Sequence, residues 1–465
     1  MSRAMPSLCA RFAVTIALSG AATVVASPAF AGDADLIAQG KYIATASDCV
    51  ACHTTAGGET MAGGLAIETP IGSIMSTNIT PSKENGIGNY TLKQFDAALR
   101  KGVRADDKHL YPAMPYTSYA LLSDEDVGAL YAYFMKGVAP VETRPPETKL
   151  PFPFNIRLSM AAWNLLFLDN GSYKPDPAQD TEWNRGAYLA RGPAHCGTCH
   201  TPRNLFMAEK TSSEMAGAGI FPWHAPNITS DSNSGVGGWS VEELVAYMRD
   251  GHATGKSQAA GPMAEAVDNS LRFLTPEDLK AIAVYVKSIP AVHDAADTKP
   301  VFAWGSPSNE LASIRGVALP LDRDQMSGPQ IYDAYCATCH QAEGQGSFDG
   351  GLPSLLHNTA LGRANTDNLV MVMLEGLHRQ PDVLMPGFAK ELSDIQIATL
   401  SSYLIQHFGN PAAKVTVGQV AELRAGPAKS VLVAVARAGL AVGALAVIGF
   451  VAWLLRRRKT VARTA

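Results

Sequence analysis

The chain has 465 residues, of which 47% are hydrophobic and 17% charged, and its formal net charge is −4. This length exceeds that of one ordinary domain, so two to four domains are expected. The slightly acidic balance, without a basic stripe carrying interleaved aromatic residues, argues against a nucleic-acid partner.

The first 31 residues have the pattern of a secretory signal peptide. Arg3 and Arg11 precede the apolar run FAVTIALSGAATVVA, and the A-x-A sequence Ala29-Phe30-Ala31 precedes Gly32. This order of charge, apolar run and small residues is typical of an export signal. An uncleaved N-terminal anchor is the alternative, but the apolar run is short for a membrane span. We therefore predict that residues 1–31 are a signal peptide.

Three copies of the motif Cys-x-x-Cys-His follow, at residues 49–53, 196–200 and 336–340. They use six of the seven cysteines, and the seventh, Cys9, lies in the predicted signal peptide. No cysteine is left for a structural disulfide, which argues against a disulfide-stapled secreted fold.

The motif supplies two thiols for the vinyl groups of a haem and an imidazole for its iron, on one helical turn. A zinc site would need further Cys or His at ligand spacing, and a thioredoxin-like dithiol would need a βαβ setting; neither is visible. We predict three covalently bound haem c groups with the iron ligands His53, His200 and His340. The attachment residues are Cys49, Cys52, Cys196, Cys199, Cys336 and Cys339.

An iron that carries electrons needs a second axial ligand, and methionine raises its potential. One methionine beside a proline lies shortly before the last helix of each unit: Met114 in YPAMPY, Met263 in AAGPMAEAV and Met385 in VLMPGF. The prolines are expected to keep these loops non-helical. The matching positions predict that these three methionines are the second ligands.

Two other assignments compete with this one. Most methionines fill cores, and Met371 and Met373 fit a buried helix face. His109, His252 and His378 would give bis-histidine iron of lower potential, but each stands alone in a polar stretch and is interpreted as a surface residue.

A backbone carbonyl against each motif histidine would fix its ring. Pro353 lies 13 residues after His340 and is a candidate for this contact, and Pro226 is the candidate in the second unit. Thr77 stands at the equivalent place in the first unit.

Two of the units share an insert. Residues 78–102 and 227–251 are both 25 long and match at N-I-T, at G-[IV]-G and at a closing glycine. This is duplication of a unit, and the third, shorter unit is the more distant copy. N-I-T also fits a glycosylation pattern, but the repeat explains it better.

Each unit closes with a capped amphipathic helix, starting after Ser123, after Thr275 and after Ser393 with Gln396 in a capping box; Gly409 is the expected stop of the third. Helices also lead into the first two motifs, and strand patterns are sparse. The predicted fold is mainly α, with three tandem cytochrome c-type domains at 32–145, 181–295 and 321–412. Residues 146–180, 296–320 and 413–430 are expected to connect the parts.

The segment 140–176 starts Pro-rich and then becomes apolar between Ile156 and Phe167. It is interpreted either as a helix that packs two domains together or as a surface for a partner subunit or the membrane.

Residues 438–455 hold 18 residues without a charge, followed by four cations at 456–459. This length just crosses the hydrocarbon layer. Basic residues stay cytoplasmic, so we predict a transmembrane helix at 431–455, a cytoplasmic tail at 456–465 and an external, periplasmic body. Arg437 lies near the outer end, where its side chain can reach the interface.

The order of signal peptide, three haem motifs, STNITP, GIGNYT, LYPAMPY, CHTPRN, AGPMAEA and C-terminal anchor resembles the triheme cytochrome c subunits of membrane-bound flavin-dependent dehydrogenases. These are the fructose, gluconate and sorbitol dehydrogenases of acetic acid bacteria and relatives. The resemblance covers nearly the whole mature chain, and every predicted ligand and attachment residue matches it.

The resemblance implies an electron-transfer subunit in the bacterial inner membrane. A flavoprotein large subunit with FAD would oxidise a sugar, polyol or sugar acid, a small third subunit would accompany it, and ubiquinone would accept the electrons. No G-x-G-x-x-G, G-x-S-x-G or H-E-x-x-H motif marks an enzyme site in this chain. A subunit of a quinoprotein alcohol or aldehyde dehydrogenase, a terminal oxidase subunit and a haem peroxidase remain the alternatives.

Overall fold

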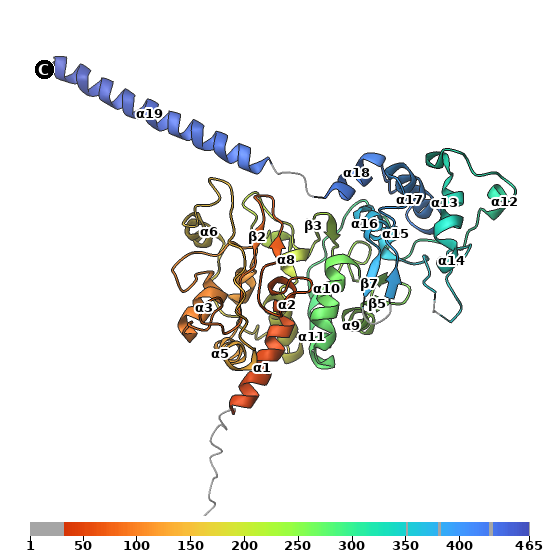
Figure 1. The fold of residues 1–465 in the computed structure, drawn as a ribbon, viewed down its shortest axis with the longest axis horizontal. Coiled ribbons are helices and arrows are strands. Elements are labelled where there is room, and N and C mark those ends of the chain that lie inside the picture. Colours follow the sequence, from red (N-terminus) through yellow and green to blue (C-terminus); the bar gives the residue numbers. More distant parts are fainter. Residues whose placement is uncertain (1–31, 350–351, 380–382, 427–430, 465) are drawn as a thin grey trace, which may run out of the picture.

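A computed structural model describes residues 32–349, 352–379, 383–426 and 431–464 (Figure 1). The predicted signal peptide lies outside the described residues. The fold is mostly helical, as expected, and its strands form only two-stranded antiparallel ribbons in the described part of the chain.

Three helical units follow one another, each opening with a helix that leads into a haem motif. The first contains α1 (Asp33–Ala46), α2 (Cys49–His53), β1 (Ala66–Ile67), β2 (Ile74–Met75), α3 (Leu92–Lys101), α4 (Tyr116–Tyr119), α5 (Asp124–Ala132) and the π-helical turn η1 (Tyr133–Gly137). Helix α6 (Ser159–Phe167) lies between the first and second units.

The second unit repeats this order. It contains α7 (Thr181–Arg191), α8 (Gly197–His200), η2 (Thr211–Ser213), β3 (Ala218–Ile220), β4 (Trp223–Ala225), α9 (Val241–Asp250), β5 (His252–Ala253), β6 (Ser257–Gln258), α10 (Gly261–Asn269), η3 (Leu271–Phe273) and α11 (Pro276–Ser288).

The third unit is shorter and is followed by a long terminal helix. It contains α12 (Leu311–Ile314), η4 (Arg323–Gln325), α13 (Gly328–Tyr335), α14 (Ala337–His340), α15 (Thr359–Gly362), α16 (Asp367–Glu375), β7 (Leu377–Arg379), β8 (Val383–Met385), α17 (Asp394–Phe408) and α18 (Val417–Ala425), before α19 (Leu432–Thr464).

The closing helices begin where the sequence predicts. The side chains of Ser123, Thr275 and Ser393 each accept a hydrogen bond from a backbone N–H in the first turn. The capping box of Ser393 with Gln396 is confirmed, and α17 ends at Gly409. Short-range hydrogen bonds therefore determine these helix starts.

In each unit a glycine allows the helix before the haem motif to cross closely over the capped closing helix. A Cβ on Gly40 of α1 would lie 2.0 Å from the Ala129 carbonyl oxygen of α5. A Cβ on Gly186 of α7 would lie 1.9 Å from the Ala281 carbonyl oxygen of α11. Gly328 of α13 packs in the same way against Tyr403 of α17, with 2.5 Å to its Cβ. All three units thus share this helix crossing.

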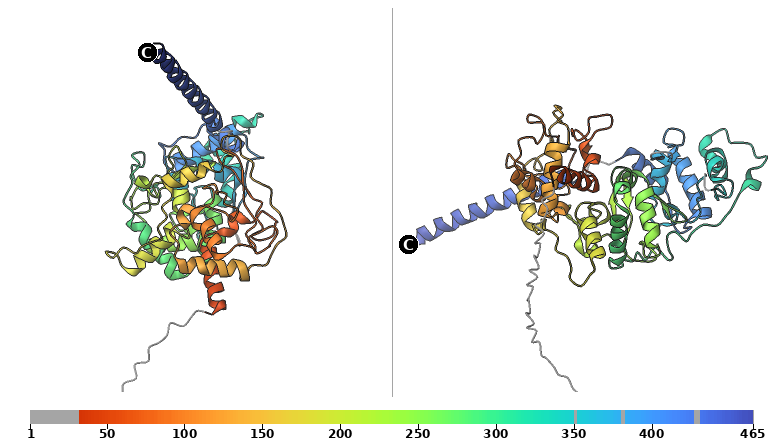
Figure 2. Two further views of the ribbon diagram at one scale, coloured as in Figure 1. Left: turned by 90° about the vertical axis from the view of Figure 1, so that its left-hand side faces the viewer. Right: turned by 90° about the horizontal axis from the view of Figure 1, so that it is seen from below.

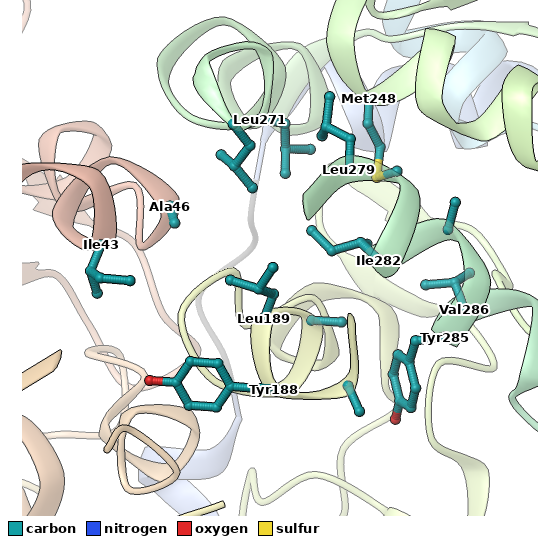
Figure 3. Packing of buried hydrophobic residues seen from close by; sticks show 14 of the residues in the cluster. Ile43, Ala46, Tyr188, Leu189, Met248, Leu271, Leu279, Ile282, Tyr285 and Val286 are labelled. Carbon is teal, nitrogen blue, oxygen red and sulfur yellow. The ribbon is translucent and has the colours of Figure 1, made fainter. Parts of the chain in front are cut away.

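The first two units share one hydrophobic core. Ile43 and Ala46 of α1 belong to the same buried cluster as Leu189 of α7 and Ile282 of α11 (Figure 3). A polar contact also joins the two units: the Tyr42 hydroxyl of α1 donates a hydrogen bond to Asp278 of α11 at 2.6 Å. These two units therefore pack as one body rather than as separate domains.

The third unit has its own core, and Trp223 of the second unit is buried in it. The side chain of Asn368 bonds both backbone groups of His224, at 2.9 and 2.8 Å. The predicted linkers 296–320 and 413–430 are only partly irregular, because the short helix α12 lies in the first and α18, with Val420 and Leu423 buried in the third core, lies in the second. Val301 within the first linker is also fully buried, and its N–H donates to the carbonyl oxygen of Asn233.

Helix α19 leads away from the compact body (Figures 1 and 2). Its residues Leu432–Leu454 form the one helix in the described part of the chain that is long and apolar enough to cross a membrane. None of this stretch is buried in the protein. The helix runs on to Thr464, so the predicted tail continues the helix instead of leaving it.

Candidate haem-binding sites

A sharp turn precedes the motif in the first two units. Asp48 and His195 stand directly before the first cysteine and adopt left-handed φ values of 47° and 35°. The turn ends the leading helix and starts a new helical turn that carries the two cysteines three residues apart. In this arrangement both thiols project from the same face.

Each motif histidine is held by a backbone carbonyl. The Nδ1 atom lies 2.6 Å from the Thr77 oxygen for His53, 2.7 Å from the Pro226 oxygen for His200, and 2.9 Å from the Pro353 oxygen for His340. The contacts of Pro226 and Pro353 predicted from the sequence are confirmed, and Thr77, which is not a proline, makes the same contact in the first unit.

The contact determines which nitrogen is free. A carbonyl only accepts, so Nδ1 must carry the proton and Nε2 keeps its lone pair in the neutral ring. Burial lowers the pKa of His53 and His340 and lowers that of His200 to about 4. Each imidazole is therefore neutral at pH 7 and keeps the lone pair of Nε2 available to bind a metal.

The six cysteines form no disulfide. Burial raises the pKa of Cys49, Cys196 and Cys336 to about 12. A reactive dithiol needs thiolates, which these surroundings disfavour. Buried neutral thiols beside a neutral imidazole match the needs of thioether attachment and axial ligation.

One glycine per unit supports this geometry and was missed in the sequence. The N–H groups of Gly63, Gly217 and Gly346 donate to the carbonyl oxygens of His53, His200 and His340, at 2.8, 2.7 and 3.1 Å. All three have left-handed φ, between 69° and 91°.

These glycines also contact the segments that hold the imidazoles. A Cβ on Gly63 would lie 2.5 Å from the Thr77 oxygen, and one on Gly346 would lie 2.8 Å from the Pro353 carbonyl carbon. The glycines follow the motif histidines by 10, 17 and 6 residues. With no constant spacing, no sequence signal could have found them.

The N-I-T repeats fix the carbonyl-bearing segments. The side-chain oxygens of Asn78 and Asn227 accept hydrogen bonds from both the N–H and the hydroxyl of the threonine two residues on. Both asparagines are buried, and their amides donate to the Val141 and Val292 oxygens. The N-I-T repeat thus has a structural role in both units. This agrees with the interpretation that duplication of a unit, and not glycosylation, explains the repeated sequence.

The three proline-flanked methionines follow equivalent structures. Helices α3, α9 and α16 each end at a glycine with positive φ, namely Gly102, Gly251 and Gly376. An antiparallel pairing comes next in each unit: Val103 with His109, β5 with β6, and β7 with β8. The returning strand leads toward Met114 and Met263, and Met385 is its last residue.

The expectation of three non-helical loops holds only in part. Met114 lies in a bend, but Met263 is in the first turn of α10 and Met385 ends β8. Pro262 stands where a helix needs no N–H donor, so it starts α10 instead of preventing it. Met114 and Met263 pack partly buried against the shared core, and Met385 packs against the third.

The competing residues behave differently. His252 and His378 are exposed, as expected for surface residues. His109 is not: it is partly buried, and its Nδ1 atom has no hydrogen-bond partner. Met371 and Met373 are fully buried core residues, as predicted.

Comparison with known proteins agrees with these features. The family model "Cytochrome c" matches residues 37–137, and the model "Cytochrome C oxidase, cbb3-type, subunit III" matches residues 323–404. The chain is 45% identical to the fructose dehydrogenase cytochrome subunit of Gluconobacter japonicus, over 91% of both chains. The chain belongs to the cytochrome c subunits of membrane-bound dehydrogenases.

Two further relatives define the range of this family. The gluconate 2-dehydrogenase cytochrome c subunit of Pantoea cypripedii is 39% identical over 87% of this chain and 94% of its own. The cytochrome c subunit of the quinone alcohol dehydrogenase of Gluconacetobacter polyoxogenes is 38% identical over 84% and 85%. A dehydrogenase cytochrome subunit carries electrons on covalently bound haem c and leaves substrate oxidation to a catalytic partner.

Proposed function

We propose that this dehydrogenase cytochrome subunit carries three haem c groups, one in each helical unit, including the middle unit. Haem c, when bound, supplies a reversible one-electron carrier. The six motif cysteines hold the groups covalently, and His53, His200 and His340 bind the irons. Met114, Met263 and Met385 are the second axial ligands.

The observation that carries this proposal is the threefold contact between a motif histidine and a backbone carbonyl. The carbonyl fixes the ring tautomer and leaves Nε2 free, so that it would bind the iron of a haem held by the motif cysteines. The middle unit has this contact, at 2.7 Å, with the same glycine support as its neighbours. An unrelated use of the second motif would not need either feature.

Electrons enter from a catalytic partner and leave to the membrane. The relative of highest identity among those described belongs to a fructose dehydrogenase, and the resemblance of the motifs points to a flavoprotein large subunit with FAD and a small third subunit. Ubiquinone is the proposed acceptor. Helix α19 anchors the subunit in the bacterial inner membrane, with the units periplasmic and the four terminal cations cytoplasmic. Residues 1–31 direct export.

The test is gentle detergent extraction of the subunit from its native membrane, followed by mass spectrometry of the proteins and haem masses that remain with it. A mass increase of three haems and a co-purifying flavoprotein are expected. A screen of sugars, polyols and sugar acids on that complex would name the substrate. A quinoprotein partner would move the chain to the alcohol dehydrogenase branch, and an oxidase partner would overturn the proposal.

A further inference from the structure

Helix α6, between the first two units, exposes its apolar side chains. Leu158, directly before the helix, and Leu165 and Leu166 within it are 74%, 86% and 70% exposed. Leu205 and Phe206, in the loop after the second motif, are 92% and 66% exposed. These five residues are called the α6 patch.

The patch is contiguous and rigidly held. The Trp163 indole of α6 donates to the Phe206 carbonyl oxygen at 2.8 Å, and the rings of Phe167 and Phe206 lie 5.9 Å apart. Asn164 accepts from the Tyr116 hydroxyl of the first unit at 2.8 Å. The helix therefore packs two units together, one of the two interpretations of this segment, while its outer face stays uncovered. Large contiguous apolar surfaces mark interaction sites.

The end of α19 lies beside the chain that leads into the patch. Arg437 donates from Nε to the Phe152 carbonyl oxygen at 3.0 Å. Arg437 is the last charge before the uninterrupted apolar run 438–455. An arginine at the end of a span places its guanidinium at the lipid–water boundary. Phe152, itself half exposed, then lies at that boundary, six residues before Leu158.

The views agree with this placement. Helix α19 points away past the side of the body that carries α6, whereas α12 lies at the opposite end (Figures 1 and 2). Helix α6 therefore lies at the end of the body toward which α19 runs.

The charge of the segment indicates how it would bind. Residues 151–168 contain one charged residue, Arg157, and α6 contains none. Interfacial helices that recognise anionic headgroups carry a Lys/Arg-rich polar face, which α6 lacks. Burial of apolar side chains in lipid is the interaction that remains.

We propose that the α6 patch inserts into the outer leaflet of the membrane, as a second attachment point beside α19. This proposal rests on the proposed membrane topology of α19. The second attachment would hold the first two units at a fixed orientation over the bilayer. A partner subunit and a second copy of the chain are the other occupants that the test separates.

The experiment is photo-crosslinking of the full-length subunit in its native complex and membrane. Leu165→benzoylphenylalanine and Leu166→benzoylphenylalanine report on the patch. Phe450→benzoylphenylalanine reports on α19, and Leu321→benzoylphenylalanine is the matched control, because Leu321 is fully exposed between α12 and α13, far from α6. Mass spectrometry distinguishes lipid adducts from protein adducts.

Lipid adducts are expected at positions 165, 166 and 450, several-fold above the yield at 321. After purification into vesicles, the yield at 165 should not change between zwitterionic and anionic lipids or with added salt, because no charge is involved. Lipid adducts at 450 alone, or adducts at 165 with another subunit or a second copy, would overturn the inference and leave the anchor intact. An absence of lipid adducts at 450 would instead reject the topology on which it rests.

Discussion

Arg379 of β7 reaches from the third unit and donates through Nη2 to Asp268 of α10 at 2.8 Å, with only 3% of its side chain exposed. Its Nη1 donates to the Asp250 carbonyl oxygen at 2.7 Å. The pair thus joins the ribbon that ends at Met385 to the helix that begins beside Met263. This buried link fixes how the third unit docks on the second.

Removal of this link should weaken the docking. Breaking a buried ion pair by losing one partner costs about 3–5 kcal/mol when the other charge stays buried and unpaired. Asp268 keeps Arg272 as a second partner at 3.7 Å, so the loss should lie at the lower end of this range. We expect Arg379→Met to lower the free energy of unfolding by about 3 kcal/mol in denaturant titrations. Arg249→Met is the control: its pair with Asp250 is half exposed, so the loss should stay below about 1 kcal/mol. Equal losses would mean that the buried pair has no special role.

The glycine beside the first motif makes a sharper prediction. Gly63 and Gly57 both have φ of 72°, but a Cβ on Gly63 would lie 2.3 Å from the Thr77 carbonyl carbon, whereas nothing lies within 4 Å of one on Gly57. Each alanine variant carries a left-handed strain of about 1–2 kcal/mol. Only Gly63→Ala should also displace the carbonyl from His53.

The readout is the midpoint potential of the haems. Loss of the Nδ1 contact makes the imidazole a weaker donor, so one of the three potentials should rise in Gly63→Ala and none should shift in Gly57→Ala. If both variants leave all three potentials unchanged, the carbonyl contact does not tune the iron.

The second axial ligands can be tested by spin state. Met114→Leu, Met263→Leu and Met385→Leu each keep the volume of the side chain and remove its sulfur. We expect one haem of three to become high-spin in each variant, measured by electron paramagnetic resonance of the ferric protein. Met371→Leu is the control, since Met371 is core filler in α16 and its loss should leave three low-spin signals. A variant that stays fully low-spin would identify a wrong ligand.

The helix crossing predicts opposite effects for two neighbouring glycines. Gly40→Ala would push a methyl group into the Ala129 carbonyl, and overpacking of this kind costs about 1–3 kcal/mol. Gly128 lies in the facing helix α5 with nothing within 4 Å of a new Cβ. Gly128→Ala should therefore stabilise the protein by about 0.5–1 kcal/mol. Thermal unfolding of both variants should show shifts of opposite sign.

The junction of the first two units should weaken in acid. Burial alone would raise the pKa of Asp278, but hydrogen bonds from Arg185 and Tyr42 and the charge of Arg185 hold it below its usual value. An acid with a lowered folded pKa contributes stability above its unfolded pKa, near 4, and loses it as the pH falls further. Stability measured between pH 6 and pH 3 should therefore fall more steeply in the native protein than in Asp278→Asn. Parallel curves would show that this carboxylate does not control the junction.

Local signals in the sequence predicted much of this molecule. Helix starts at Ser123, Thr275 and Ser393 depend on hydrogen bonds three residues away. The carbonyl-bearing residues Thr77 and Pro226 directly precede the two N-I-T repeats. The proline before Met263 was misinterpreted, because Gly-Pro starts a helix as readily as it ends one.

Features set by distant contacts were not predictable. The shared core of the first two units is sealed by Tyr42 and Asp278, which are 236 residues apart. The three supporting glycines lie at unequal distances from their histidines because the loops between them differ in length. Only the folded chain brings these groups together.

The chain has two hydrophobic cores, one shared by the first two units and one in the third. This division determines which parts of the chain could be exchanged between related proteins. Cutting the chain between the first and second units would expose hydrophobic core residues on each half, such as Ile43 on the first and Leu189 on the second. The third unit, by contrast, buries its own interior and docks on the second through side-chain contacts that include Trp223, Asn368 and Arg379. In a chimaeric protein the first two units would have to be transferred together. The third unit could be replaced separately, to change the midpoint potential of the haem proposed for it.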